Sequence, residues 1–357
     1  MRRQKPLKHP AYYIACLLVF LLVGLWFLTS ETYEERFSTR LEPYAPLAFR
    51  VEDFDGLERT LFRFPADKGH MLTGCMYSAG TGQKGIVVIA HGLGGGGHNS
   101  MMDVAAYFAR NGYYVFAYDA TGNGRSEGKG IGGIPQGVID LEYAISFVEN
   151  SGNFPSLPVV LFGHSWGGYC VCSVLSFHPE VRAVIECSGC NTSYDLFKAA
   201  GKKEGGAFIY AMMPFIRLHE KIHFGKYADA SALDGFAASK AAVMVVYSAD
   251  DDVVPIETGY DLFYEKYGSD PRFTFVRFEN RGHNYVYDDH TYINEFNAEY
   301  DEWFKALDYD HAENPDRFAA DRAEFFSAHL DREKWSTRLD PELFARFLSF
   351  YDAHIGP

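Results

Sequence analysis

The sequence predicts an α/β protein whose mostly parallel sheet is covered by helices on both faces. Strand-like and helix-like runs alternate through residues 57–307, and this alternation is typical of a doubly wound architecture. Several strand-like runs, such as GIVVIA and AAVMVVYS, are apolar throughout, as expected for strands that are buried on both faces. With 357 residues, of which 47% are hydrophobic, the chain can bury one large core.

The predicted elements follow one another in a regular order. TLFRF, MLTGCMYS and GIVVIA come first, followed by the helix-like MMDVAAYFARNG and the strand YYVFAYD. The runs PVVLF, AVIEC, AAVMVVYS and RFTFVRF complete a predicted eight-stranded sheet. The remaining helix-like runs are GVIDLEYAISFVEN, WGGYCVCSVLSFH, ETGYDLFYEKYG and YINEFNAEYDEWFKAL.

Two segments lie outside this alternation. Residues 191 to about 240 contain GGAFIYAMMPFIRLHEKIHFGKY, which we interpret as a helical cap over the site. An ordinary buried excursion is the alternative, because methionine and aromatic side chains also fill cores. Residues 308–357 are predicted to form a helical C-terminal extension, in which Asp340 and Pro341 match an N-cap and a first-turn proline. An apolar helical stripe follows at Leu343, Phe344, Phe347, Leu348 and Tyr351.

The first thirty residues predict a membrane anchor. Residues 11–28 are almost wholly apolar, close to the roughly 20 residues that span a bilayer core. A cleaved signal peptide or a buried helix is the alternative, but the run is longer than a usual signal-peptide core and Leu28-Thr29-Ser30 is a poor cleavage site. Residues 31–56 are predicted to form a short polar stalk that leads to the α/β domain.

The charges that flank this span predict its orientation. The positive-inside rule places the N-terminus in the cytoplasm and the α/β domain on the extracytoplasmic side. The basic residues before the span are Arg2, Arg3, Lys5 and Lys8, and the acidic residues after it are Glu31, Glu34 and Glu35.

Composition excludes several classes of protein. The formal net charge of −14 disfavours binding to nucleic acid, and no tandem cysteine or histidine pairs occur at structural zinc spacing. The six cysteines follow no disulfide framework. Cys187-x-x-Cys190 could be a redox pair, but it opens no clear helix, so buried thiols are favoured while a structural disulfide stays open.

A serine at a strand-to-helix turn is the main catalytic signal. LPVVLFGHSWGGYCVCSVLSF predicts a strand, a tight turn and a helix, and the glycines of GHSWG (163–167) permit the sharp turn that exposes Ser165. GRSEG (124–128) fits the same pentapeptide pattern, but it lies in a glycine-rich loop with no immediate helix. We therefore interpret Ser126 as a loop residue.

A serine nucleophile needs a base to take its proton and an acid to orient that base. The strand-like VMVVYSADDDVVP ends in Asp250, Asp251 and Asp252, which are the candidate acids. The next strand leads to NRGHN, where His283 follows a glycine. His290 has no such turn before it and is interpreted as a surface residue.

Together these motifs resemble the α/β-hydrolase superfamily over roughly residues 60–307. HGLG, DATGNGRSEG and GHSWGG are closest to its serine aminopeptidase and monoacylglycerol lipase branch. In that family the acid stands two residues before a Val-Pro pair and the base follows a glycine, which Asp251 and His283 match, although Ser248 replaces a glycine often seen there. The resemblance therefore implies Ser165 as nucleophile, Asp251 as acid and His283 as general base, in the chain order of this fold.

The resemblance also implies an oxyanion hole made of two backbone N–H groups. These belong to Leu93, in the HGLG turn, and to Trp166, which follows the nucleophile; His91 is interpreted as a structural turn residue. A dinucleotide site is a competing interpretation, because residues 92–97 satisfy GxGxxG and Asp119 ends the next strand. That interpretation leaves the serine turn and the Gly-His unexplained, and the family pattern gives Asp119 a structural place.

The expected activity is hydrolysis of carboxylic esters that carry lipid-like or other hydrophobic acyl groups. It follows from the family resemblance, the apolar insertion and the anchor, and it requires neither a metal nor an organic cofactor. The alternatives are a serine aminopeptidase or amidase, an acyltransferase on the same triad, and a catalytically inactive scaffold. The motifs specify the fold more strongly than the substrate, and the oligomeric state stays open.

Overall fold

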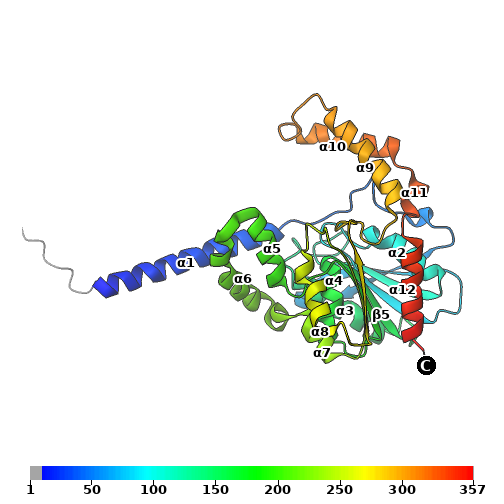
Figure 1. Cartoon of the computed structure of the whole chain (residues 1–357), viewed down its shortest axis with the longest axis horizontal. Coiled ribbons are helices and arrows are strands. Elements are labelled where there is room, and N and C mark those ends of the chain that lie inside the picture. Colours follow the sequence, from blue (N-terminus) through cyan, green and yellow to red (C-terminus); the bar gives the residue numbers. More distant parts are fainter. Residues whose placement is uncertain (1–9, 357) are drawn as a thin grey trace, which may run out of the picture.

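The structure is a computed structural model that describes residues 10–356 (Figure 1). Its eight-stranded sheet has the order β1-β2-β4-β3-β5-β6-β7-β8. β2 runs antiparallel to both β1 and β4, and every other neighbouring pair is parallel, so the predicted mostly parallel sheet is confirmed. The strands are β1 Glu58–Pro65, β2 Met71–Ser78, β3 Gly85–Ala90, β4 Tyr113–Asp119, β5 Val159–His164, β6 Ala183–Cys187, β7 Ala242–Ser248 and β8 Phe273–Phe278.

Helices cover both faces of this sheet. Successive strand residues point to opposite faces, so Val88 of β3 joins one core cluster while Val87 and Ile89 join the other. The first cluster is completed by α3, α4, α7 and α8, and the second by α2 and α12. These helices are α2 Met102–Arg110, α3 Gln136–Asn150, α4 Trp166–Ser173, α7 Ala232–Ala238, α8 Tyr260–Tyr267 and α12 Pro341–His354.

The C-terminal extension departs from the sheet and then returns to it. α9 (His290–Lys305) projects away from the body and packs on α10 (Pro315–His329) through Phe296, Phe325 and Phe326 (Figure 1). After α11 (Arg332–Ser336), α12 docks on the sheet, where the hydroxyl of Tyr351 donates to the carbonyl oxygen of Leu161 at 2.6 Å. The apolar stripe predicted in this tail therefore faces the core.

The insertion between β6 and β7 forms helices α5 (Ser193–Gly205) and α6 (Ile209–Phe224), followed by α7. These helices lie beside the C-terminal part of α1 (Pro10–Phe37), which projects from the body as a long rod (Figure 1). Among residues 10–356, α1 is the single helix long and apolar enough to cross a membrane, with a mean hydropathy of 2.4 in its most apolar window.

The two ends of α1 have different surroundings. Apolar side chains from Tyr12 to Val23 are exposed, whereas Tyr33 and Phe37 are buried against α5 and α6. Residues 31–37, which the sequence placed in a stalk, thus continue the helix. The basic residues used to orient the span, Arg2 to Lys8, lie outside the described residues.

Candidate active site

Ser165 lies at the sharp turn between β5 and α4. Its backbone has φ 57° and ψ −118°, a conformation that L-residues rarely adopt and that raises the side chain out of the turn. A β-carbon on Gly163 would overlap the carbonyl group of Gly167, and one on Gly167 would overlap that of Ala90. The glycines of the motif are therefore required by close backbone packing under the serine.

His283 lies beside this serine and connects it to a carboxylate. Its Nε2 is 2.8 Å from Oγ of Ser165, and its Nδ1 is 2.7 Å from Oδ2 of Asp251. Because a carboxylate only accepts, Nδ1 carries the proton and Nε2 is free to accept from the serine hydroxyl. The other oxygen of Asp251 accepts the N–H groups of Val253 and Val254, which fixes the carboxylate.

The two neighbouring acids take other positions. Oδ1 of Asp250 accepts from the hydroxyl of Ser248 and from the N–H of Gly282, so it joins the loop after β7 to the turn that holds His283. The Ser248 bond lowers the pKa of Asp250. Asp252 is exposed and pairs with Lys203. Of the three candidate acids, only Asp251 contacts the imidazole.

A second histidine, which the sequence did not predict, holds His283 in place. The ring of His164 is buried, and its Nε2 donates to the carbonyl oxygen of His283 at 2.9 Å. Burial lowers the pKa of His164 to about 4, so the ring is neutral near pH 7 and holds the base without competing for its proton. The sequence signal for it is the histidine of GHSWG, directly before Ser165.

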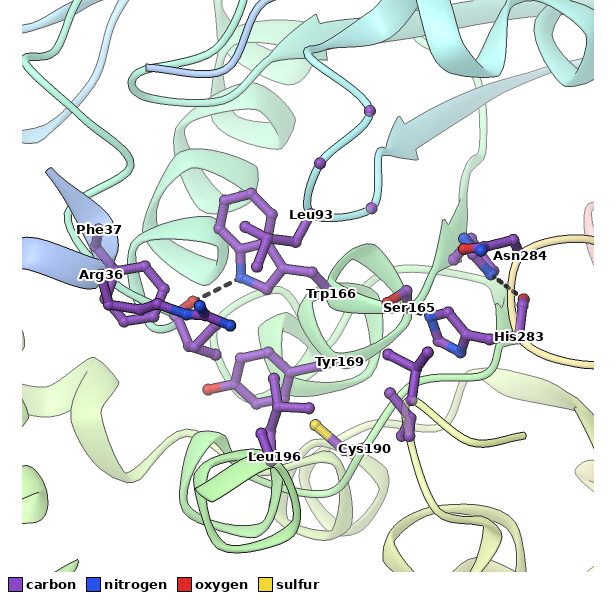
Figure 2. A pocket seen from close by; sticks show the side chains of 18 of the residues that line it. Arg36, Phe37, Leu93, Ser165, Trp166, Tyr169, Cys190, Leu196, His283 and Asn284 are labelled. Carbon is purple, nitrogen blue, oxygen red and sulfur yellow. Dashed lines mark hydrogen bonds between the residues drawn. The ribbon is translucent and has the colours of Figure 1, made fainter. Parts of the chain in front are cut away.

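Leu93 and Trp166, the two residues predicted to form the oxyanion hole, line the same cavity as Ser165 and lie near each other (Figure 2). Trp166 is the first residue of α4, and the helix itself provides no acceptor for an N–H at that position. Its indole is buried and donates to the carbonyl oxygen of Ile134 at 2.8 Å, which anchors the turn. Backbone N–H groups and the positive end of a helix both favour a developing negative charge here.

The second pentapeptide has a closed environment. The hydroxyl of Ser126 donates to the carbonyl oxygen of Asp119 at 2.5 Å and accepts the N–H of Thr73 at 2.8 Å. The carboxylate of Asp119 bonds the ring of His98 at 2.6 Å and the N–H of Arg125 at 2.9 Å. Both oxygens of Asp119 are thus occupied by protein groups, which leaves no free acid for a nucleotide ribose.

The remaining candidates have structural contacts. His91 accepts the N–H of Ala120 through Nε2 at 3.1 Å, as expected for a turn residue. His290 begins α9 and bonds the carbonyl oxygen of Tyr285. All six cysteines are free thiols, and burial raises the pKa of Cys187 and Cys190, which disfavours thiolate chemistry at that pair.

A cavity of about 910 Å³ opens above Ser165 and His283. Its walls come from helices α5 and α6, from the C-terminal part of α1 and from the C-terminal extension, and they are mainly apolar. Figure 2 shows Arg36 and Phe37 of α1 lining the same cavity as Ser165, with Leu196 contributed by α5. A long hydrophobic group could therefore extend from the serine toward α1.

Comparison with known proteins agrees with this architecture. Residues 81–218 match the family model described as serine aminopeptidase, S33. The monoacylglycerol lipase of Mycolicibacterium smegmatis is 31% identical over 119 residues, which are 32% of this chain and 40% of the lipase. The chain thus matches only about two fifths of the length of that relative. The matched family segment includes Ser165 but ends before Asp251 and His283.

Solved structures share the fold at low sequence identity. An esterase from Pyrococcus furiosus superimposes with a TM-score of 0.54 and 14% identity, covering 90% of this chain and 99% of the esterase. A second crystal form of the same esterase gives a TM-score of 0.54 at 15% identity, covering 82% and 98%. At these identities the likeness concerns the fold.

Proposed function

We propose that this chain, which has the α/β-hydrolase fold, is a membrane-anchored serine hydrolase of the esterase and lipase type that cleaves carboxylic esters. The observation that supports this most directly is the continuous chain of contacts from Asp251 through His283 to Ser165, at 2.7 and 2.8 Å, at the floor of an apolar cavity.

In the proposed reaction, Nε2 of His283 takes the proton of Ser165 as Oγ attacks the acyl carbon. Asp251 keeps the proton on Nδ1 and stabilises the imidazolium that forms. The N–H groups of Leu93 and Trp166 would stabilise the oxyanion, each by about 3 kcal/mol. His283 then protonates the leaving alcohol and activates water, which hydrolyses the acyl-enzyme.

The proposed substrates are esters with lipid-like or other hydrophobic acyl groups. The cavity's apolar lining favours an acyl chain, and its extension to α1 would bring the site close to a bilayer that α1 crosses. We propose that the N-terminus is cytoplasmic and the α/β domain extracytoplasmic. Because the matching family model is described as a serine aminopeptidase, cleavage of aminoacyl amides is the second candidate activity.

A fluorophosphonate probe tests the nucleophile in the full-length, detergent-solubilised protein. Labelling is expected in the wild type and in Ser126→Ala, and is expected to be lost in Ser165→Ala. Unchanged labelling of a folded Ser165→Ala protein would exclude Ser165 as the nucleophile.

A substrate panel then tests the acyl preference. kcat/KM for p-nitrophenyl esters is expected to rise from acetyl to medium and long acyl chains, and to exceed that for aminoacyl p-nitroanilides. A clear preference for the anilides would replace the esterase proposal with the aminopeptidase.

A further inference from the structure

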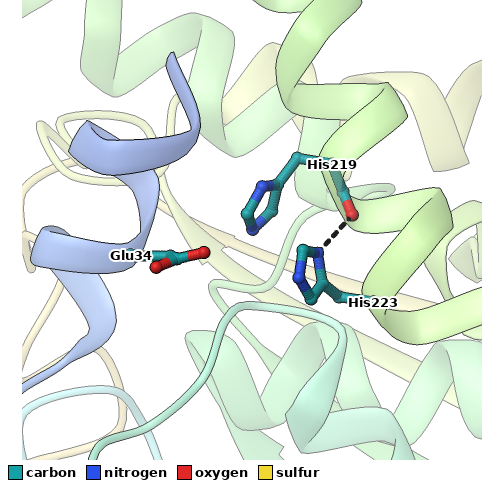
Figure 3. Close-up of side chains that lie close together, drawn as sticks. All are labelled: Glu34, His219 and His223. Carbon is teal, nitrogen blue, oxygen red and sulfur yellow. Dashed lines mark hydrogen bonds between the residues drawn. The ribbon is translucent and has the colours of Figure 1, made fainter. Parts of the chain in front are cut away.

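Three potential metal ligands converge where α1 packs against α6. Glu34 of α1 points toward His219 and His223 of α6 (Figure 3). One carboxylate oxygen and one nitrogen of each ring all lie within 4.8 Å of one another. The two histidines are four residues apart, so one face of the helix presents both rings. Two imidazoles and a carboxylate are also the donor set that Zn²⁺ takes in many proteins.

The His219 ring has no hydrogen-bond partner among the described residues. Among the described residues, neither ring forms a hydrogen bond or an ion pair with Glu34. His219 is only 2% exposed, and its Nδ1 is buried with no hydrogen-bond partner. Buried ring nitrogens in folded proteins are normally bonded. A metal ion can therefore bind the His219 ring without breaking an existing hydrogen bond of that ring.

The orientation of His223 fits a ligand histidine. Its Nδ1 donates to the carbonyl oxygen of His219 at 2.9 Å, which leaves the lone pair of Nε2 available. Metal-bound histidines usually donate their second ring N–H in this way, because the bond fixes the tautomer and the ring. The nearby ammonium of Lys68 bonds the backbone carbonyl oxygen of His223 at 3.4 Å and none of the three side chains.

A second cluster, made of one histidine and two glutamates, differs in this respect. Nδ1 of His178 lies 2.8 Å from Glu180 and 3.8 Å from Glu149, so an ordinary ion pair already accounts for the contact. That cluster is therefore a suitable control for the first.

We propose that Glu34, His219 and His223 bind a divalent transition-metal ion, with Zn²⁺ as the ion of choice. Zinc ligands at about 2.1 Å from the metal lie about 3.4 Å apart in a tetrahedron, so modest side-chain rotations would close this site. The fourth position would be left to water. Imidazole and carboxylate donors suit Zn²⁺, whereas Ca²⁺ and Mg²⁺ prefer oxygen ligands alone.

The metal site would connect α1 to α6 beside the cavity above Ser165. Tyr33, adjacent to Glu34, lines that cavity and donates to Oε1 of Glu220 on α6 at 2.9 Å. An ion that joins α1 to α6 would therefore hold one wall of the cavity in place. This inference depends on the α1–α6 contact and not on the identity of the substrate.

The experiment measures binding of Zn²⁺ to full-length protein in detergent, purified with a tag that contains no histidine and stripped with a chelator. Isothermal titration should show about one high-affinity equivalent in the wild type, and added Zn²⁺ should raise Tm. Glu34→Gln and His223→Gln, both at exposed positions, should each weaken the affinity at least tenfold and reduce the shift in Tm. His178→Gln should bind like the wild type.

Co²⁺ provides a second readout that does not depend on activity. Visible d–d absorption of the cobalt-loaded wild type should be lost in His223→Gln and kept in His178→Gln. Equal zinc affinity in wild type, Glu34→Gln and His223→Gln would overturn the proposal, as would loss of the high-affinity equivalent in His178→Gln alone.

Discussion

Ser165 and Ser126 occupy the same pentapeptide pattern in opposite environments. Ser165 stands on a strained turn, with Nε2 of His283 at 2.8 Å and a cavity above it. Ser126 is 2% exposed, and its hydroxyl both donates to Asp119 and accepts from Thr73. A serine whose donor and acceptor capacities are both used by the backbone cannot be activated without unfolding its loop. The difference teaches that the surroundings of the hydroxyl, and not the motif, determine its chemistry.

The largest difference between the two serines should be catalytic. We expect Ser165→Ala to lower kcat for a preferred ester by about 10⁶-fold, because the nucleophile itself is removed. Ser126→Ala should keep kcat within about tenfold of the wild type, since its hydroxyl faces no substrate. Steady-state kinetics of both folded variants measure this contrast, and equal losses would show that the comparison is mistaken.

The next largest effect should separate the acids behind the nucleophile. Asp251→Asn should lower kcat about 10⁴-fold, because an amide can no longer hold the proton on Nδ1 of His283. Asp252→Asn is the matched control, since that side chain is 77% exposed and contacts only Lys203. If the two substitutions reduce kcat equally, the acid has been assigned wrongly.

The bond between His98 and Asp119, which precedes the loop that contains Ser126, should make the free energy of unfolding depend on pH. Burial alone lowers the pKa of His98, but its bond to Asp119 outweighs this effect and raises the pKa from 6.5 to about 9. The folded protein therefore keeps a proton that the unfolded chain releases above pH 6.5. The resulting stabilisation is complete below pH 6.5 and is lost as pH rises through about 9, a change of up to about 3 kcal/mol.

Unfolding in detergent at pH 6 to 9.5 measures this dependence. In His98→Gln the free energy of unfolding should change less over the same interval, because the titrating ring is absent. Parallel curves for wild type and variant would assign the dependence to other groups.

The smallest effect should be the loss of stability in Ser126→Ala. The substitution leaves the buried N–H of Thr73 without its acceptor, which should lower the free energy of unfolding by about 2 kcal/mol. Ser165→Ala removes no such backbone partner and should change stability less. Thermal unfolding of the two variants at pH 6 compares them directly, and the reverse order would contradict the assigned environments.

The sequence by itself determined the strands and the nucleophile turn. Continuous apolar runs such as GIVVIA predict buried parallel strands, and glycines around Ser165 predict a turn too tight for other residues. The strand ends limited the acid to Asp250, Asp251 or Asp252, and the family resemblance predicted Asp251, with His283 as the base. These features depend on local chemistry, so a short segment contains the information.

The tertiary structure decided the features that depend on contacts between segments far apart in the sequence. It brought Asp251 within 2.7 Å of His283, joined His164 to the carbonyl oxygen of His283, and brought α1 into the wall of the cavity. It also placed α12 on the sheet while α9 turned away, through contacts such as that of Tyr351 with Leu161, 190 residues apart. Contacts between such distant segments depend on the complementary shape of whole surfaces, which no local pattern contains.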